Sequence, residues 1–102
     1  KPIGYFPTNR YPESERDIAI IVDEDIPSTQ IQKIIDRHKL AKESQPFDLY
    51  TGVGVPAGKK SIAYRVVFQS DKATLTSEII DRAQGDILRQ LERELGAELR
   101  TQ

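Results

Sequence analysis

The sequence predicts an α+β fold in which two helices cover one face of a four-stranded antiparallel sheet. Three observations support this: apolar runs with strand patterning, two stretches with apolar residues at helical spacing, and turns rich in glycine or proline between them. The resulting order, β-α-β-β-α-β, is the split βαβ order of a ferredoxin-like sandwich. Because βαβ crossovers are almost always right-handed, both helices are expected on the same side of the sheet.

The N-terminal part predicts an extended arm followed by a folded domain. Three prolines within residues 1–14 prevent a helix there, and aromatic residues between them favour packing of the arm on the domain. The domain is expected to fill residues 15–102. Its first element is a buried strand at residues 18–22, where five apolar residues, four of them β-branched, stand between two aspartates.

A helix and two further strands are expected in the middle of the chain. Ser28 or Thr29 is expected to cap the helix, whose isoleucines recur at helical spacing and form one buried face. Alternation of apolar and polar residues predicts a strand at 47–51, whereas residues 39–46 show no clear pattern. A glycine-rich turn then leads to a second strong strand at 61–68.

The last third of the chain predicts a long helix and a short closing strand at residues 97–100. Thr76 is expected to be the N-cap of the helix, and Gly96 is expected to end it. The buried face of the helix is marked by apolar residues at helical spacing, namely Ile80, Ala83, Ile87, Leu91 and Leu95.

The face of the sheet without helices is expected to expose alternate side chains of two strands. If Phe47 and the leucine two positions later point to the helices, Asp48 and Tyr50 point away from them. The same alternation places Ser61 and Arg65 on this open face. A stacking ring, hydrogen-bonding groups and a cation on one surface are typical of proteins that bind single-stranded RNA.

Composition excludes several other classes of protein. The 102 residues include 15 basic and 16 acidic ones, so the chain lacks the strongly basic balance of most nucleic-acid-binding domains. Zero Cys and one His leave no disulfide, no thiol nucleophile and no basis for a metal site, so we expect neither a catalytic residue nor a cofactor in this domain. No apolar run is long enough to span a membrane. The absence of Met indicates a processed chain or a piece of a longer protein.

Residues 48–74 are the segment most suited to phosphate contacts, with four basic residues against two acidic ones. Alternative interpretations stay open for the two features on which RNA binding depends. Tyr50 can instead cover the sheet or lie beneath the arm, because tyrosine is often only partly buried. Lys59 and Lys60 can instead form an ordinary solvated turn.

Five short motifs resemble those of one known family. In chain order they are RDIAIIVDED at 16–25, FDLYTG at 47–52, GKKSIA at 58–63, TLT at 74–76 and LGAELR at 95–100. Their order and spacing are similar to those of the ferredoxin-fold anticodon-binding domain that ends the beta subunit of bacterial phenylalanine–tRNA ligases. The resemblance covers about residues 5–100. One departure is the polar segment ending in Pro46, where the family has apolar residues; it indicates a strand that begins late or lies at an edge.

The resemblance implies a cytoplasmic domain that binds the anticodon of phenylalanine tRNA. Its partners would be the catalytic alpha subunit and the rest of the beta subunit in an α2β2 enzyme that uses ATP and magnesium elsewhere. By motif, Asp48 and Ser61 would hydrogen-bond a base edge while Tyr50 stacks on it. Charge and position on the sheet add three phosphate contacts: Lys59, Lys60 and Arg65. The alternative is a ferredoxin-like module that binds a protein or a small ligand and no RNA.

Overall fold

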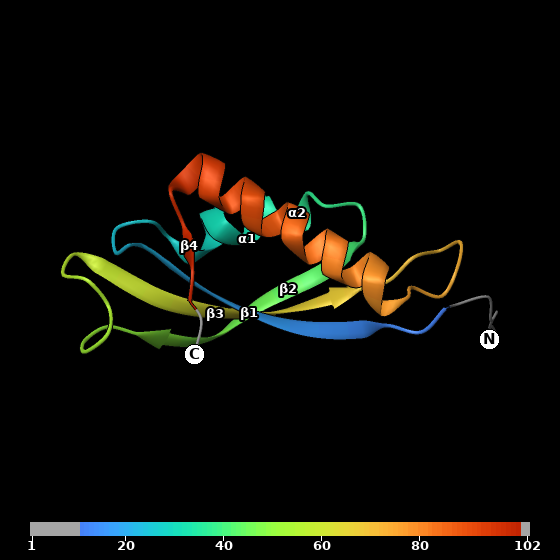
Figure 1. Cartoon of the computed structure of the whole chain (residues 1–102), viewed down its shortest axis with the longest axis horizontal. Coiled ribbons are helices and arrows are strands. Elements are labelled where there is room, and N and C mark those ends of the chain that lie inside the picture. Colours follow the sequence, from blue (N-terminus) through green and yellow to red (C-terminus); the bar gives the residue numbers. More distant parts are fainter. Residues whose placement is uncertain (1–10, 101–102) are drawn as a thin grey trace, which may run out of the picture.

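The computed structural model describes residues 11–100 and places two helices on one face of a four-stranded sheet (Figure 1). The strands lie in the order β2-β3-β1-β4, and every neighbouring pair is antiparallel. This confirms the predicted fold class and element order. In chain order the elements are β1 (Ser14–Asp23), α1 (Ser28–Asp36), β2 (Ala41–Tyr50), β3 (Lys59–Phe68), α2 (Ser77–Leu95) and β4 (Glu98–Leu99).

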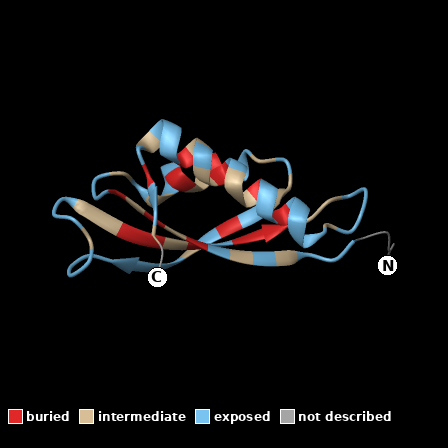
Figure 2. Cartoon of the chain, viewed as in Figure 1, coloured by how far each residue is buried: buried red, intermediate tan, exposed pale blue. Residues whose placement is uncertain are grey.

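The hydrophobic core fills the layer between the helices and the sheet. Figure 2 shows the buried segments where the helices face the central strands, and exposed segments along β2 and on the outer side of α2. The largest fully buried side chains are Tyr64 and Phe68 of β3, which pack with isoleucines of β1 and α1 and with Leu91 of α2. Apolar residues at the predicted helical spacing therefore hold both helices on one face and leave the other face of the sheet without a helix.

Strand β1 begins near the end of the predicted arm, and the division into arm and domain stays a prediction. Strand β1 begins at Ser14, one residue inside the predicted arm of residues 1–14, and pairs there with the end of β3. The Tyr11 carbonyl accepts a hydrogen bond of 2.6 Å from Nε2 of Gln69, so the last residues before β1 contact the domain. Residues 1–10, including the aromatic residues Tyr5 and Phe6 of the predicted arm, lie outside the described part of the chain.

Strand β2 begins six residues earlier than predicted, at Ala41, and it is an edge strand. Its pairing with β3 shifts register twice, between Ala41 and Glu43 and between Pro46 and Asp48. Each shift inserts an extra residue and breaks the period of two, which is why residues 39–46 showed no strand pattern. The expectation that Pro46 marks an edge is confirmed, whereas the expectation of a late start is wrong.

The two helices begin differently. Thr76 caps α2 as predicted, because its Oγ1 accepts a hydrogen bond of 3.2 Å from the backbone N–H of Ile79. The predicted cap of α1 is wrong: Pro27 occupies the N-cap position with extended backbone angles, no side chain caps the helix, and Ser28 is already helical. Gly96 ends α2 at φ 67°, in the left-handed region that glycine adopts without strain.

Candidate nucleic-acid interface

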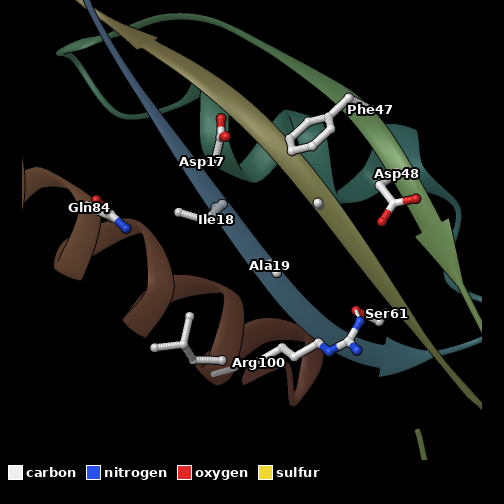
Figure 3. Close-up of a pocket in the computed structure, with 10 residues that line it drawn as sticks. Asp17, Ile18, Ala19, Phe47, Asp48, Ser61, Gln84 and Arg100 are labelled. Carbon is white, nitrogen blue, oxygen red and sulfur yellow. Dashed lines mark hydrogen bonds between the residues drawn. The ribbon is translucent and has the colours of Figure 1, made fainter. Parts of the chain in front are cut away.

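A depression of about 380 Å³ lies on the open face of the sheet and extends past β1 to Gln84 of α2 (Figure 3). Its floor includes Ala19 of β1 and Ala63 of β3, which lie directly opposite each other in the sheet. Alanine side chains leave space above the sheet that longer side chains would fill. Phe47 and Asp48 of β2 border the depression on one side, and Arg100, which follows β4, borders it on the other.

Phe47 lies on this open face, although alternation predicted that it would point to the helices. The register shift between Pro46 and Asp48 allows two consecutive residues to face the same side, and Figure 3 shows the ring pointing from β2 toward Asp17. The Phe47 side chain is 50% exposed, and the Arg65 guanidinium lies 4.8 Å from the centre of its ring. The bulge therefore adds an aromatic ring to the surface that sequence reasoning did not expect there.

Asp48 lies where the sequence predicted it. It is paired with Ala63 in the sheet, it is exposed, and its carboxylate points into the depression (Figure 3). An ionised carboxylate only accepts hydrogen bonds, so Asp48 offers acceptors for N–H groups of a ligand.

Tyr50 also lies on the open face, at the end of β2. Its hydroxyl donates a hydrogen bond of 2.9 Å to the carbonyl of Val53 in the following turn. The Arg100 guanidinium lies 5.2 Å from the centre of its ring, and 37% of the side chain is exposed. Gly52 adopts φ 130° beside the ring, and a Cβ there would come within 3.3 Å of the Tyr50 hydroxyl. The turn thus holds the ring in place while part of it stays accessible.

Ser61 faces the same side but is covered. It pairs with Tyr50 in the sheet, only 3% of the residue is exposed, and its Oγ accepts a hydrogen bond of 3.0 Å from Nη1 of Arg100. A ligand that contacts the Ser61 hydroxyl must therefore displace or join the Arg100 side chain. The structure brings the predicted Asp48, Tyr50 and Ser61 together on the open face, at neighbouring positions of β2 and β3, and Asp48 and Ser61 line the depression.

Arg100 is a further residue of this surface that sequence reasoning missed. In Figure 1 the chain leaves α2 and runs past the sheet toward its open side. There the backbone N–H of Arg100 donates a hydrogen bond of 2.8 Å to the carbonyl of Ala19. From this position the side chain reaches both Ser61 and the Tyr50 ring. The only signal in the sequence was its place at the end of the LGAELR motif, to which no role had been given.

The three predicted phosphate contacts have different surroundings. Arg65 lies on the open face and donates hydrogen bonds of 3.0 and 3.3 Å to the two carboxylate oxygens of Asp17. These hydrogen bonds and the negative charge of Asp17 raise the pKa of Arg65 further above its ordinary value. Arg65 is therefore a fixed cation beside Phe47, already paired with one carboxylate.

The two lysines lie on opposite faces at the start of β3. Lys59 is opposite Asp23 in the sheet, and its Nζ lies 3.2 Å from that carboxylate. Lys60 is opposite the buried Val22, on the helix side, and its Nζ donates a hydrogen bond of 2.5 Å to the carbonyl of Ile26. Alternation along β3 thus turns Lys60 away from the open face, and its role as a phosphate contact stays a prediction.

Two further observations concern residues 11–100 only. In this part of the chain no three His, Asp or Glu side chains are grouped as a metal ion requires. None of its helices is long and apolar enough to cross a membrane.

Comparison with known proteins relates this fold and surface to one family. The family model described as the ferredoxin-fold anticodon binding domain matches residues 9–100. The chain is 43% identical over 99 residues to the phenylalanine–tRNA ligase beta subunit of Syntrophotalea carbinolica, which covers 95% of the chain and 12% of the relative. It is 41% identical over 95 residues to that of Dehalococcoides mccartyi strain CBDB1, covering 93% of the chain and 12% of the relative.

The beta subunit of Halalkalibacterium halodurans is 39% identical over 100 residues, which cover 96% of the chain and 12% of the relative. The chain thus spans about 12% of the length of these curated relatives, while the family model covers nearly all of the chain. The motifs, the strand order and the family match agree, and the chain belongs to the ferredoxin-fold anticodon-binding domain family.

Proposed function

We propose that this chain binds the anticodon of phenylalanine tRNA on its open sheet face. The observation that supports the proposal is the grouping of Asp48, Tyr50 and Ser61 at neighbouring positions of β2 and β3 on the open face, in a chain that belongs to an anticodon-binding family. The three come from the two motifs that resemble the family's base-contacting segments, and the open face has no helix above it.

The chemistry of these side chains suits one unpaired base. The partly exposed Tyr50 ring offers a stacking surface, and stacking on an aromatic side chain tolerates any base. The Asp48 carboxylate accepts hydrogen bonds from N–H donors on a base edge, which discriminates among bases. The Ser61 hydroxyl becomes available when the Arg100 guanidinium moves aside, and that guanidinium then offers its donors to the RNA.

The proposal extends to the complete enzyme. The relatives are beta subunits of phenylalanine–tRNA ligases, so we place this chain in such a subunit, in an α2β2 enzyme of the cytoplasm. Joining phenylalanine to its tRNA with ATP and magnesium would be the work of the catalytic alpha subunit. In this assignment the domain contributes tRNA selection and positioning, and it needs no cofactor of its own.

A binding experiment tests the proposal directly. The 102-residue chain, labelled with ¹⁵N, is titrated with the anticodon stem-loop of phenylalanine tRNA and followed by NMR, which detects weak binding. Shifts of amides in β2, β3 and around Arg100 are expected, and Tyr50→Ala is expected to weaken binding by about 1–3 kcal/mol. Tyr11→Ala is the matched control, because Tyr11 is also 37% exposed but lies at the other end of the sheet.

Unchanged affinity of the Tyr50→Ala variant would remove Tyr50 from the site. The alternative, a ferredoxin-like module for protein interaction or small ligands, makes a different prediction. It is favoured if the stem-loop shifts no open-face amide while gel filtration shows a tight homodimer formed through the same face.

A further inference from the structure

We propose that Phe47 and Arg65 form a second base-binding site on the open face, so that the surface holds two unpaired bases at once. One base would stack on Tyr50 and the other on Phe47, with Asp48 between them. This inference rests on the proposed function and goes further, because it sets the number of bases that the sheet contacts and names the residue that holds the second.

The exposure of Phe47 is the first observation. Phe47 is 50% exposed although it is a large apolar residue, so it is accessible to a ligand. The bulge between Pro46 and Asp48 turns Phe47 to the open face and leaves it without a paired residue on β3. Bulges are common beside functional sites, where they redirect a side chain.

The position of Arg65 is the second observation. Its guanidinium is held by two hydrogen bonds to Asp17 and lies 4.8 Å from the centre of the Phe47 ring. A cation in this position is attracted to the ring and restricts its rotation, so the ring is oriented before a base arrives. Because the guanidinium lies over one face of the ring, a base would stack on the opposite face or take the place of the guanidinium.

The same arrangement occurs twice on β2. Tyr50 has Arg100 at 5.2 Å, and Phe47 has Arg65 at 4.8 Å, each ring being partly exposed beside its guanidinium. The rings are three positions apart in the sequence, which corresponds to about 10 Å along a strand, too far for one base to stack on both. The depression above Ala19 and Ala63 adjoins Phe47, and the Asp48 carboxylate, which lies between the two ring positions on β2, points into it. A base stacked on Phe47 can therefore direct its edge into the depression, toward Asp48.

The test combines protein variants with altered RNA. The affinity of Phe47→Ala for the anticodon stem-loop is measured by NMR titration of the 102-residue chain, next to Tyr50→Ala. A 5- to 150-fold increase of Kd, roughly, is expected for loss of one stacked base. Phe47→Leu keeps an apolar side chain without a ring and is expected to lose a similar factor. Leu49→Ala is the control, because Leu49 is 63% exposed on the same strand but is paired on the helix side with Ile62.

Stem-loops with a single abasic nucleotide identify the base at each ring. If Phe47 stacks on one base, removing that base cancels the effect of Phe47→Ala, and a different abasic position cancels the effect of Tyr50→Ala. The second site is overturned if Phe47→Ala and Phe47→Leu bind like Leu49→Ala, or if the same abasic position cancels the effects at both rings.

The outcomes separate this inference from the proposed function. If Tyr50→Ala weakens binding and the Phe47 variants do not, the surface has a single base site and only the second site is wrong. If neither Tyr50→Ala nor the Phe47 variants change the affinity, the assignment of the open face to RNA is wrong as well. A ¹⁵N spectrum of each variant that retains the dispersion of the original chain shows that its fold is intact.

Discussion

The hydroxyl of Tyr64 connects the central strand β3 to the start of α1, and its removal tests how the helix is fixed on the sheet. Tyr64 is fully buried, and its hydroxyl donates a hydrogen bond of 3.0 Å to the carbonyl of Ser28. Tyr64→Phe removes only the oxygen, so the ring keeps its packing in the core. At neutral pH the variant is expected to lose about 1 kcal/mol of unfolding free energy, the usual net value of one hydrogen bond.

The stability difference between the two proteins is expected to depend on pH. Burial raises the pKa of the Tyr64 hydroxyl above the ordinary value of 10.0. The unfolded chain therefore releases this proton at lower pH than the folded chain does. The contribution of Tyr64 to stability is complete below that ordinary pKa and decreases by about 1.4 kcal/mol per pH unit above it, until the folded pKa is reached.

These two effects predict that the more stable of the two proteins at neutral pH becomes the less stable one at high pH. At about pH 7 the original chain is the more stable protein by about 1 kcal/mol, and near pH 11 the linkage loss of about 1.4 kcal/mol makes Tyr64→Phe the more stable one. Urea unfolding of both proteins at the two pH values, followed by circular dichroism, measures the difference. All other titrating groups are shared, so their effects cancel in the comparison. A difference that stays constant between the two pH values would refute the reasoning.

Two further substitutions test a helix end and a predicted RNA contact. Gly96→Ala is expected to lower the free energy of unfolding, measured with urea, by about 1 kcal/mol. The loss comes from backbone strain alone, because residue 96 adopts φ 67° and an added Cβ would meet no atom within 4 Å. Unchanged stability would show that the helix end adjusts freely. Lys60→Gln is expected to leave the salt dependence of stem-loop binding unchanged, because Lys60 binds the Ile26 carbonyl on the helix side. Lys59→Gln is expected to reduce the slope of log K against log salt by about 0.7, and the same reduction for Lys60→Gln would place Lys60 at the RNA.

The fold was predictable wherever the patterns of the chain are uninterrupted. Strand β3 alternates without a break, so its sequence correctly placed Tyr64 in the core and Arg65 on the open face. The apolar residues of α2 recur with helical spacing and are buried or partly buried as expected. In both elements one face is packed, which fixes the register of the side chains.

Strand β2 was predicted only in part, because its two bulges do not follow a periodic pattern. The alternation at its end correctly placed Asp48 and Tyr50, but it put Phe47 on the wrong face. A bulge depends on how two strands match each other, which the sequence of one strand does not specify.

The candidate site was predicted from its local motifs but not from its long-range contacts. Ser61 and Arg100 are 39 positions apart in the sequence, and they meet only because β4 pairs beside β1 in the folded sheet. The covering of Ser61 by Arg100 is therefore a property of the strand order. The pairing of Arg65 with Asp17 likewise depends on the register of β1 against β3.

The irregular shape of β2 has a consequence for the solution behaviour of the chain. An edge strand with exposed apolar side chains is a template on which another chain can add a strand, which leads to aggregation. Pro46 has no N–H to donate, and the two bulges interrupt the row of backbone groups that a second strand would need. The exposed charges of Lys42 and Glu43 oppose such pairing further. Strand β2 can thus keep aromatic rings at the open edge of a sheet without joining the sheet of a neighbouring molecule.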